Sequence, residues 1–361
     1  MKSGELLLNI NTEDIKHLYV NTLGLEFNNL CPFAEYLKDE NEQNADLNHI
    51  NSVANNQDVV FLLKSLSKPL SLLQFRLGGP KEKYLKLSIC RIDDNKFILV
   101  LFNGDSYGIQ YYEDKITLSE ILDSLVINSD AEGGNSFPEI LNFESLVLYL
   151  GIIDSLRYIK YRDTLNHQYS NLNKITSDEF RKVMKDSIEK FDVNWVLSNL
   201  MYLLPSVTKF ELKGNQAVYD ELFNNGYLLS VTDNKTNESS LLLDVKSSEL
   251  GGEFLELWYK SAGIQISFMK EGAVETHPSA FIAVTGIANH SFLFEAGSDK
   301  ITYRNYLTKV TPNIFIPLLD KLIFEKSIAE NTQESKPRFC GKCGAKVADG
   351  AKFCGKCGNN I

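Results

Sequence analysis

The chain has 361 residues, of which 43% are hydrophobic and 23% are charged, and its formal net charge is −10. This composition indicates a soluble globular protein of about two domains. The acidic balance argues against a nucleic-acid partner for the main body, because neutralising phosphates requires clustered Lys and Arg.

The beginning of the chain has no basic region followed by an apolar run, so we expect no secretory signal and a cytoplasmic location. Outside the last two dozen residues only Cys31 and Cys90 occur, and isolated cysteines suit a reducing compartment. The longest apolar stretch, residues 143–161, is interrupted by charged side chains. It therefore predicts a buried helix and no membrane span.

The first regular unit of the chain follows a polar stretch, residues 38–58, that we expect to be a loop. Residues 70–77 predict a strand, and residues 83–126 predict three strands followed by a helix, with an Asn-Gly hairpin signal between two of the strands. Thr117 and Glu120 have the spacing of a capping box, which predicts the start of that helix.

The middle of the chain, residues 138–204, is expected to be helical. Thr176 and Glu179 form a second capping-box pattern, and apolar side chains follow at helical spacing as far as Phe191. Such a stripe is typical of a core face. Pro205 is expected to end the helical region.

A second unit, residues 280–323, repeats the plan of the first, with strands followed by a helix that opens at Thr311 and Pro312. Residues 239–245 predict the strand upstream of this unit. The repetition predicts an α+β fold with two pseudo-symmetric antiparallel-sheet-plus-helix halves.

The predicted main domain covers residues 1–326. Its half-repeats span about residues 1–150 and 206–326, and helices within residues 138–204 join them.

Residues with catalytic potential are scattered along the chain. The sequence contains no metalloprotease, P-loop, dinucleotide-binding or nucleophile-elbow motif, and none of its five histidines has a metal-binding spacing. His290 falls at a predicted hairpin turn, where an exposed side chain is expected. Glu253 and Glu256 are interpreted as parts of a strand with charges on both faces. We therefore expect no catalytic residue and no enzyme.

Four large side chains are candidates for binding a protein partner. Trp258, Tyr259, Phe268 and Met269 are expected on adjacent strands, and exposed aromatic and methionine side chains are typical anchors for a partner helix. The alternative is that they face the helices that cover the sheet and belong to the core.

The end of the chain contains two matched FCGKCG segments. Cys340 and Cys343, with Cys354 and Cys357, supply four thiolates that can close a tetrahedral site around one structural Zn²⁺ without an open position. A disulfide pair or a redox Cys-x-x-Cys is the alternative, but a redox motif needs a single dithiol at a helix start within a βαβ unit.

These two segments resemble the bacterial short zinc-ribbon family. The resemblance implies a zinc ribbon over residues 338–361, preceded by a flexible linker at residues 327–337. In so small a segment, zinc coordination worth about 10–16 kcal/mol would supply the folding energy. Basic residues outnumber acidic ones in the ribbon, which favours either a solvated face or contact with an acidic surface.

The order of elements in residues 10–326 resembles the ESX secretion-associated EspG family. The resemblance is based on the segment FLLKSLSKPLSLLQFRL, on a hairpin with Gly104 and Asp105, and on the similar second half. It implies a pseudo-two-fold α+β fold and a cytosolic chaperone that binds a helical substrate of a type VII secretion system. Two other function classes stay open, namely a zinc-ribbon protein-interaction scaffold and a nucleic-acid-binding protein that acts through the basic ribbon.

Overall fold

The computed structural model describes residues 4, 6–38, 45–93, 95–167, 174–210, 216–232, 239–243, 245–306, 313–321, 338–339 and 346–347. The chain divides into two compact units, Met1–Leu319 and Asp320–Ile361.

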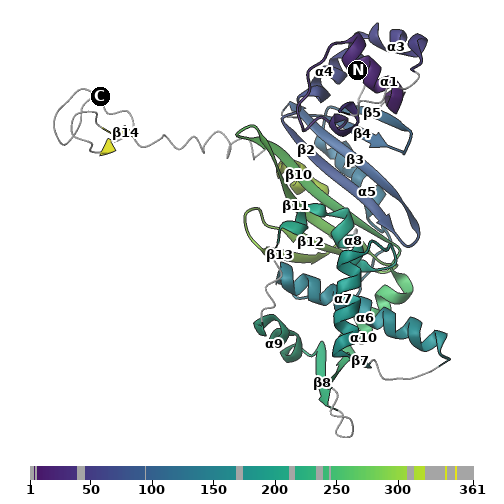
Figure 1. Cartoon of the computed structure of the whole chain (residues 1–361), viewed down its shortest axis with the longest axis vertical. Coiled ribbons are helices and arrows are strands. Elements are labelled where there is room, and N and C mark those ends of the chain that lie inside the picture. Colours follow the sequence, from purple (N-terminus) through teal and green to yellow (C-terminus); the bar gives the residue numbers. More distant parts are fainter. Residues whose placement is uncertain are drawn as a thin grey trace. The chain divides into compact units, whose positions relative to one another are not determined.

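The first unit is built on one large antiparallel sheet (Figure 1). Among the described residues, ten strands form this sheet in the order β1-β5-β4-β3-β2-β10-β11-β12-β13-β6. The strands are β1 (Leu6–Asn11), β2 (Ser71–Gly79), β3 (Glu82–Asp93), β4 (Lys96–Phe102), β5 (Ser106–Tyr112), β6 (Ile140–Asn142), β10 (Lys260–Lys270), β11 (Ala273–Val284), β12 (Asn289–Phe294) and β13 (Lys300–Asn305). The α+β architecture with an antiparallel sheet is therefore confirmed.

The centre of the sheet is the pair β2 and β10, whose register runs from Ser71 opposite Phe268 to Gly78 opposite Ser261. On one side of this pair, β2 to β5 form a meander of four sequential strands. On the other side, β10 to β13 form a second one. The only contact between the two meanders within the described sheet is this central pair.

The first meander confirms the predicted strands and helix, since β3, β4 and β5 lead into α5 (Lys115–Val126). The predicted capping box is wrong. The N-cap is Asp114, whose side chain accepts a hydrogen bond of 2.8 Å from the backbone N–H of Thr117. The helix begins earlier than expected because an aspartate with extended backbone geometry is a stronger N-cap than the threonine that follows it.

The polar stretch at residues 38–58 is a loop only in part. It contains α3 (Leu47–Ala54), and α4 (Gln57–Ser67) begins within it. Asp46 and Asn56 are the N-caps, and each accepts hydrogen bonds from two backbone N–H groups of the following turn. Polar residues that appeared to mark a loop therefore mark two helix starts.

The strand predicted upstream of the second unit is also misplaced. Residues 239–243 form β9 (Ser239–Leu243), which pairs with β7 (Lys174–Thr176) and β8 (Leu228–Thr232) in a separate sheet of order β7-β9-β8. The fourth strand of the second meander is β10, which follows α10 (Val245–Leu257). Thr311 and Pro312 lie outside the described residues, and residues 315–321 are helical as expected.

Two groups of helices pack on different parts of the sheet (Figure 1). The first group comprises α1 (Thr12–Lys16), the π-helical turn His17–Thr22, α2 (Ala34–Leu37), α3 and α4. It shares a hydrophobic cluster with β1, β4 and β5, in which Phe33 lies edge-on to both Tyr19 and Tyr107.

The second group contains α6 (Phe143–Leu165), α7 (Ser177–Glu189), α8 (Val196–Leu203), the 3₁₀ turn Pro205–Lys209, α9 (Gln216–Asn224) and α10. These helices share a cluster with β11, β12 and β13. The capping box of Thr176 and Glu179 at α7 is confirmed. Helix α8 lies directly on the central strands, because Gly263 of β10 has no Cβ to overlap the Leu203 carbonyl oxygen.

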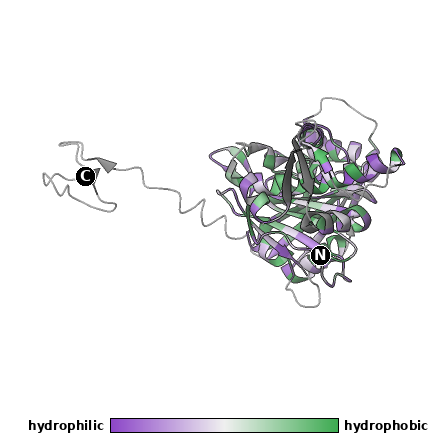
Figure 2. Cartoon of the chain, turned by 90° about the horizontal axis from the view of Figure 1, so that it is seen from below, coloured by the Kyte–Doolittle hydropathy of each residue, from purple (hydrophilic) through white to green (hydrophobic). Residues whose placement is uncertain are grey.

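Helix α6 is buried along most of its length, which confirms the interpretation of residues 143–161. Among the described residues, no helix combines the length and apolar character that a bilayer crossing requires. In Figure 2, hydrophobic stretches occupy the interior of the body and hydrophilic ones lie toward its periphery.

Two buried ionisable side chains of α6, Asp154 and Arg157, connect this helix to its neighbours. Asp154 is fully buried and accepts hydrogen bonds from the backbone N–H groups of Val196 and Leu197, at 2.9 and 3.0 Å, at the start of α8. Arg157 donates to the carbonyl oxygens of Phe254 and Asn194, at 2.7 and 2.9 Å. Both side chains satisfy main-chain groups that would otherwise be buried without partners.

Substitution of Asp154 by Asn is expected to lower the free energy of unfolding by about 1–3 kcal/mol at acidic pH, because one of the two N–H groups loses its acceptor. Burial raises the pKa of Asp154 from 3.8 to about 7, despite the two N–H groups and Arg157. The aspartate therefore loses its stabilising contribution as the pH rises from 3.8 toward 7. Urea unfolding should show the difference between wild type and Asp154→Asn shrinking over that range. If the difference in unfolding free energy between wild type and Asp154→Asn grows with pH, the pKa of Asp154 is not raised in the folded state.

Candidate functional site

The predicted zinc ligands Cys340, Cys343, Cys354 and Cys357 lie outside the described residues, as does the linker at 327–337. In the second unit, β14 (Arg338–Phe339) and β15 (Lys346–Val347) pair antiparallel, with Phe339 opposite Lys346. This pairing brings together the two ends of the segment that carries the first two cysteines. A hairpin at this position, with four thiolates in the sequence, fits a zinc ribbon.

Comparison with known families supports this reading of the tail, since the zinc-ribbon domain family matches residues 339–361. Among curated proteins, none matches the chain. The match covers the tail alone, and it indicates zinc binding there.

The four candidate partner-binding residues do not form one patch. Trp258 and Tyr259 lie in the short connection between α10 and β10, whereas Phe268 and Met269 lie near the end of β10. The two pairs are therefore not on adjacent strands, contrary to the prediction from the sequence. At about 3.3 Å per residue, ten residues of strand separate the two pairs by roughly 30 Å.

Their side chains also differ in burial. Trp258 is 3% exposed, its indole N–H donates to the Lys260 carbonyl oxygen at 3.0 Å, and the guanidinium of Arg157 lies 4.9 Å from its ring centroid. Trp258 is thus a core residue, the alternative considered from the sequence. Tyr259, Phe268 and Met269 are half-buried.

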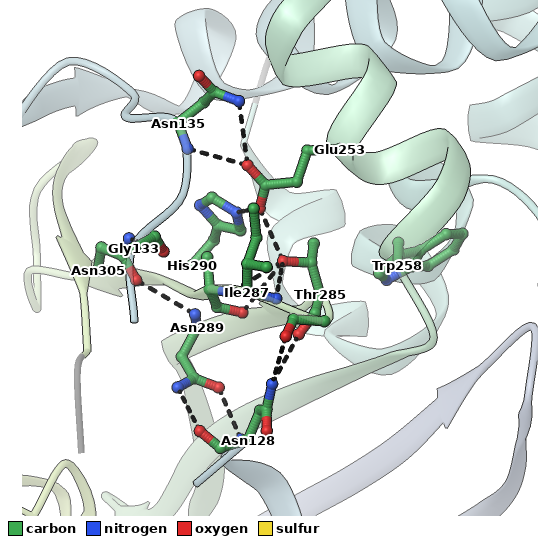
Figure 3. Close-up of polar contacts among 12 residues, drawn as sticks. Asn128, Gly133, Asn135, Glu253, Trp258, Thr285, Ile287, Asn289, His290 and Asn305 are labelled. Atoms are coloured by element: carbon green, nitrogen blue, oxygen red, sulfur yellow. Dashed lines mark hydrogen bonds and ion pairs between the residues drawn. The ribbon is translucent and has the colours of Figure 1, made fainter. Parts of the chain in front are cut away.

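A network of polar side chains lies at the β11–β12 turn, between α10 and the loop that follows α5 (Figure 3). The carboxylate of Glu253, on α10, lies 2.8 Å from Nε2 of His290 and accepts hydrogen bonds from the hydroxyl of Thr285 at 2.7 Å and from the backbone N–H of Asn135 at 2.9 Å. Nδ1 of His290 lies 3.0 Å from the hydroxyl of Tyr303.

Asparagines extend this network to the loop that follows α5 (Figure 3). Asn128 donates through its side chain to the carbonyl oxygens of Thr285 and Gly286 at 3.2 and 3.0 Å, and its backbone N–H donates to Asn289 at 2.8 Å. The side chain of Asn305 donates to the Gly133 carbonyl oxygen at 3.0 Å. The polar loop at residues 128–136 is therefore fixed to the β11–β12 turn.

The structure corrects both sequence interpretations at this network. His290 has no exposed surface and lies in β12, one strand position away from the turn, and Glu253 lies on the inner face of a helix. A histidine in a turn region is buried here because Glu253 and Tyr303 satisfy both of its ring nitrogens.

The network has a structural role, because it joins α10 to β12 and to the loop at residues 128–136. Burial opposes ionisation of Glu253, but hydrogen bonds from His290, Asn135 and Thr285 outweigh it and hold the pKa of Glu253 below its ordinary 4.5. Burial raises the pKa of Tyr303 far above its usual value. The side chains of Glu253, Thr285, His290 and Tyr303 are buried, whereas Asn135 is half-buried.

An exposed strip of three aromatic side chains lies where the first meander meets α8. Tyr84 of β3, Tyr202 of α8 and Phe191, which precedes α8, are 47%, 39% and 52% exposed. The rings of Phe191 and Tyr202 are stacked with centroids 3.8 Å apart, and the rings of Tyr202 and Tyr84 are edge-on at 5.5 Å. We call these three residues the aromatic strip.

The sequence did not identify this strip. Helical spacing predicts that Phe191 belongs to the core stripe of a helix, but α7 ends at Glu189 and Phe191 is half-exposed. Tyr84 and Tyr202 are more than a hundred residues apart in the sequence, and only the packing of α8 on the central strands brings them together. A local pattern carries no signal for such a contact.

Two cavities lie beside the sheet. One, of about 350 Å³, adjoins the aromatic strip through Tyr84, and we call it the Lys86 cavity. It is lined by Pro32, Glu35, Tyr36, Tyr84, Lys86, Ser88, Val100, Phe102 and Tyr107. The other, of about 590 Å³, lies at the β10–β11 hairpin. There Glu275 forms ion pairs with Lys270 and His277, at 3.1 and 3.5 Å, and Phe268 stacks on His277.

Proposed function

We propose that this protein is an adaptor that binds a helical segment of a secreted protein and keeps that protein soluble in the cytoplasm, as a chaperone of a type VII secretion system does. The observation that carries the proposal is the aromatic strip. Tyr202 joins the three exposed rings, because it contacts both Phe191 and Tyr84, and contiguous exposed apolar surface is typical of a site that binds a partner.

The chemistry of the strip favours a protein partner with an apolar face. Tyrosine is enriched among the residues that contribute most to protein interfaces, because its ring buries much area and loses little rotamer freedom. Rigid rings on a helix and on an adjacent strand suit the stripe of an amphipathic helix. Arg76, which donates to the Tyr202 carbonyl oxygen at 3.4 Å, adds positive charge beside the rings.

The sheet topology supports the resemblance to the EspG family. Each half contributes a four-strand meander, and the helix after each meander packs near the other, since Asn313 donates to Ser119 of α5 at 2.9 Å. We therefore propose that the two halves are related by a pseudo-two-fold axis at the β2–β10 pair. The expectation that the chain is not an enzyme stays a prediction.

The zinc ribbon is proposed to hold one structural Zn²⁺ and to act as a second contact, either for the secretion machinery or as the module that recruits the partner. Nucleic-acid binding through its basic residues is the remaining alternative. Binding of the full chain to DNA or RNA that weakens steeply with salt would favour that alternative.

The adaptor function is tested by co-expressing the chain with helical proteins encoded beside its gene and measuring the affinity of the purified complex by calorimetry. Phe191→Ala and Tyr202→Ala are each expected to weaken binding by about 2 kcal/mol, or roughly thirtyfold, as for central aromatic residues of interfaces. Their thermal unfolding should match that of the wild type, because both side chains are exposed.

Phe61→Ala is the matched control, since Phe61 of α4 is 50% exposed and lies outside the strip. It should bind as the wild type does. If none of the helical proteins binds, or if the strip variants bind as tightly as Phe61→Ala, the proposal is wrong.

A further inference from the structure

The Lys86 cavity combines an aromatic wall with a single half-buried cation. Tyr36, Tyr84, Phe102 and Tyr107 supply rings, and the side chain of Lys86 is 26% exposed. A concave site with a mostly apolar lining and one charged group is typical of a site that binds a specific ligand group.

The charge of Lys86 is poorly compensated by the protein. Its one ion pair among the described residues is with Glu35, at 4.0 Å, and the Glu35 side chain is 97% exposed. An ion pair with so exposed a partner contributes little. Burial lowers the pKa of Lys86, and the nearby positive charge of Arg76 lowers it further against the opposing effect of Glu35. The cavity therefore holds a cation that an additional carboxylate would stabilise.

We propose that the Lys86 cavity binds a large apolar or aromatic side chain of a partner protein whose neighbouring carboxylate forms an ion pair with Lys86. This inference rests on the proposed adaptor function and extends it, because the cavity shares Tyr84 with the aromatic strip. The partner helix lies along the strip and places one acidic residue and one bulky apolar residue at the cavity. Lys86 and Arg76 thus select acidic amphipathic helices over basic ones.

The cavity is tested on the full chain with two small probes of equal size, 4-phenylbutyrate and its neutral analogue 4-phenylbutyramide. Ligand-observed NMR titration should give a dissociation constant on the order of 1 mM for the carboxylate. Its binding should be about tenfold tighter than that of the amide, as expected for one charge-assisted contact.

Lys86→Met keeps the apolar stem and removes the charge, so it should abolish the preference for the carboxylate while binding of the amide persists. Glu35→Gln should strengthen carboxylate binding by about two- to threefold, because it removes the competing anion. Lys68→Met is the control, since Lys68 pairs with exposed Glu26 and does not line the cavity. Equal affinity for the two probes, an unchanged preference in Lys86→Met, or no binding at about 10 mM would each overturn the proposal.

The two experiments distinguish failure of the cavity proposal from failure of the proposed adaptor function. If a helical partner binds wild type and Lys86→Met equally well, the adaptor function stands and the role of the cavity is wrong. If the probes bind as expected and no helical partner is found, the cavity is a carboxylate site and the adaptor function is wrong.

Discussion

Removal of zinc is expected to unfold residues 338–361 and to leave the unfolding of the large sheet unchanged. A zinc ribbon of this size is too short to bury a core, so metal coordination of about 10–16 kcal/mol is expected to supply its stability. Metal analysis of the chain purified under reducing conditions should give one zinc per molecule. After chelation, protease digestion should remove the tail and leave the rest of the chain intact.

A substitution gives the same test without chelator. Cys343→Ser should lower zinc affinity by at least about a hundredfold, since it removes one of the four predicted thiolate ligands. Cys31→Ala is the control, because Cys31 is buried in the N-terminal cluster and should not affect the zinc content. A chain without zinc, or a Cys343→Ser variant that retains it, would contradict the assignment.

Substitution of Glu253 by Ala is expected to lower the free energy of unfolding by about 3–5 kcal/mol, because each buried polar group that loses its hydrogen-bond partner costs about 1–3 kcal/mol. The variant removes the carboxylate that contacts the buried side chains of His290 and Thr285 and the backbone N–H of half-buried Asn135. Urea unfolding of Glu256→Ala is the control, because Glu256 is an exposed residue of the same helix. Equal unfolding free energies of the two variants would show that the network does not stabilise the fold.

The network also predicts a pH dependence. Because the pKa of Glu253 is lowered in the folded state, its contribution is complete above the unfolded value of 4.5 and is lost as the pH falls through the folded pKa. The difference in unfolding free energy between wild type and Glu253→Gln should therefore shrink as the pH falls below about 4.5. A difference that stays constant down to about pH 3 would show that the carboxylate does not stabilise the fold through its charge.

Local pattern was sufficient for much of the fold. Alternating and β-branched side chains located β2 to β5 and β11 to β13, and the threonine and glutamate at the start of α7 located its first turn. Each of these features depends on residues close in sequence. The misassigned strand does not. Residues 239–243 form a strand, but only pairing with the distant β7, and not with β2 as for β10, places β9 outside the large sheet.

In the candidate sites, too, features that depend on neighbouring residues can be predicted from the sequence, whereas features that depend on distant residues cannot. The cysteine spacing of the tail is local and therefore visible in the sequence. Burial of His290 depends on Glu253, which is 37 residues away, and the contact between Tyr84 and Tyr202 joins residues on different elements. Burial by distant partners overrides the ordinary preference of a polar side chain for solvent.

The pairing of β2 with β10 has a consequence for synthesis of the protein. About 180 residues separate the end of one strand from the start of the other. At about 5–20 residues per second, the ribosome needs roughly 10 to 40 s to deliver the second strand. Throughout that time β2 is an open edge whose main-chain groups can pair with another nascent chain. A fragment that ends between Gly79 and Lys260 contains β2 without its β10 partner, and it is therefore expected to aggregate through this edge.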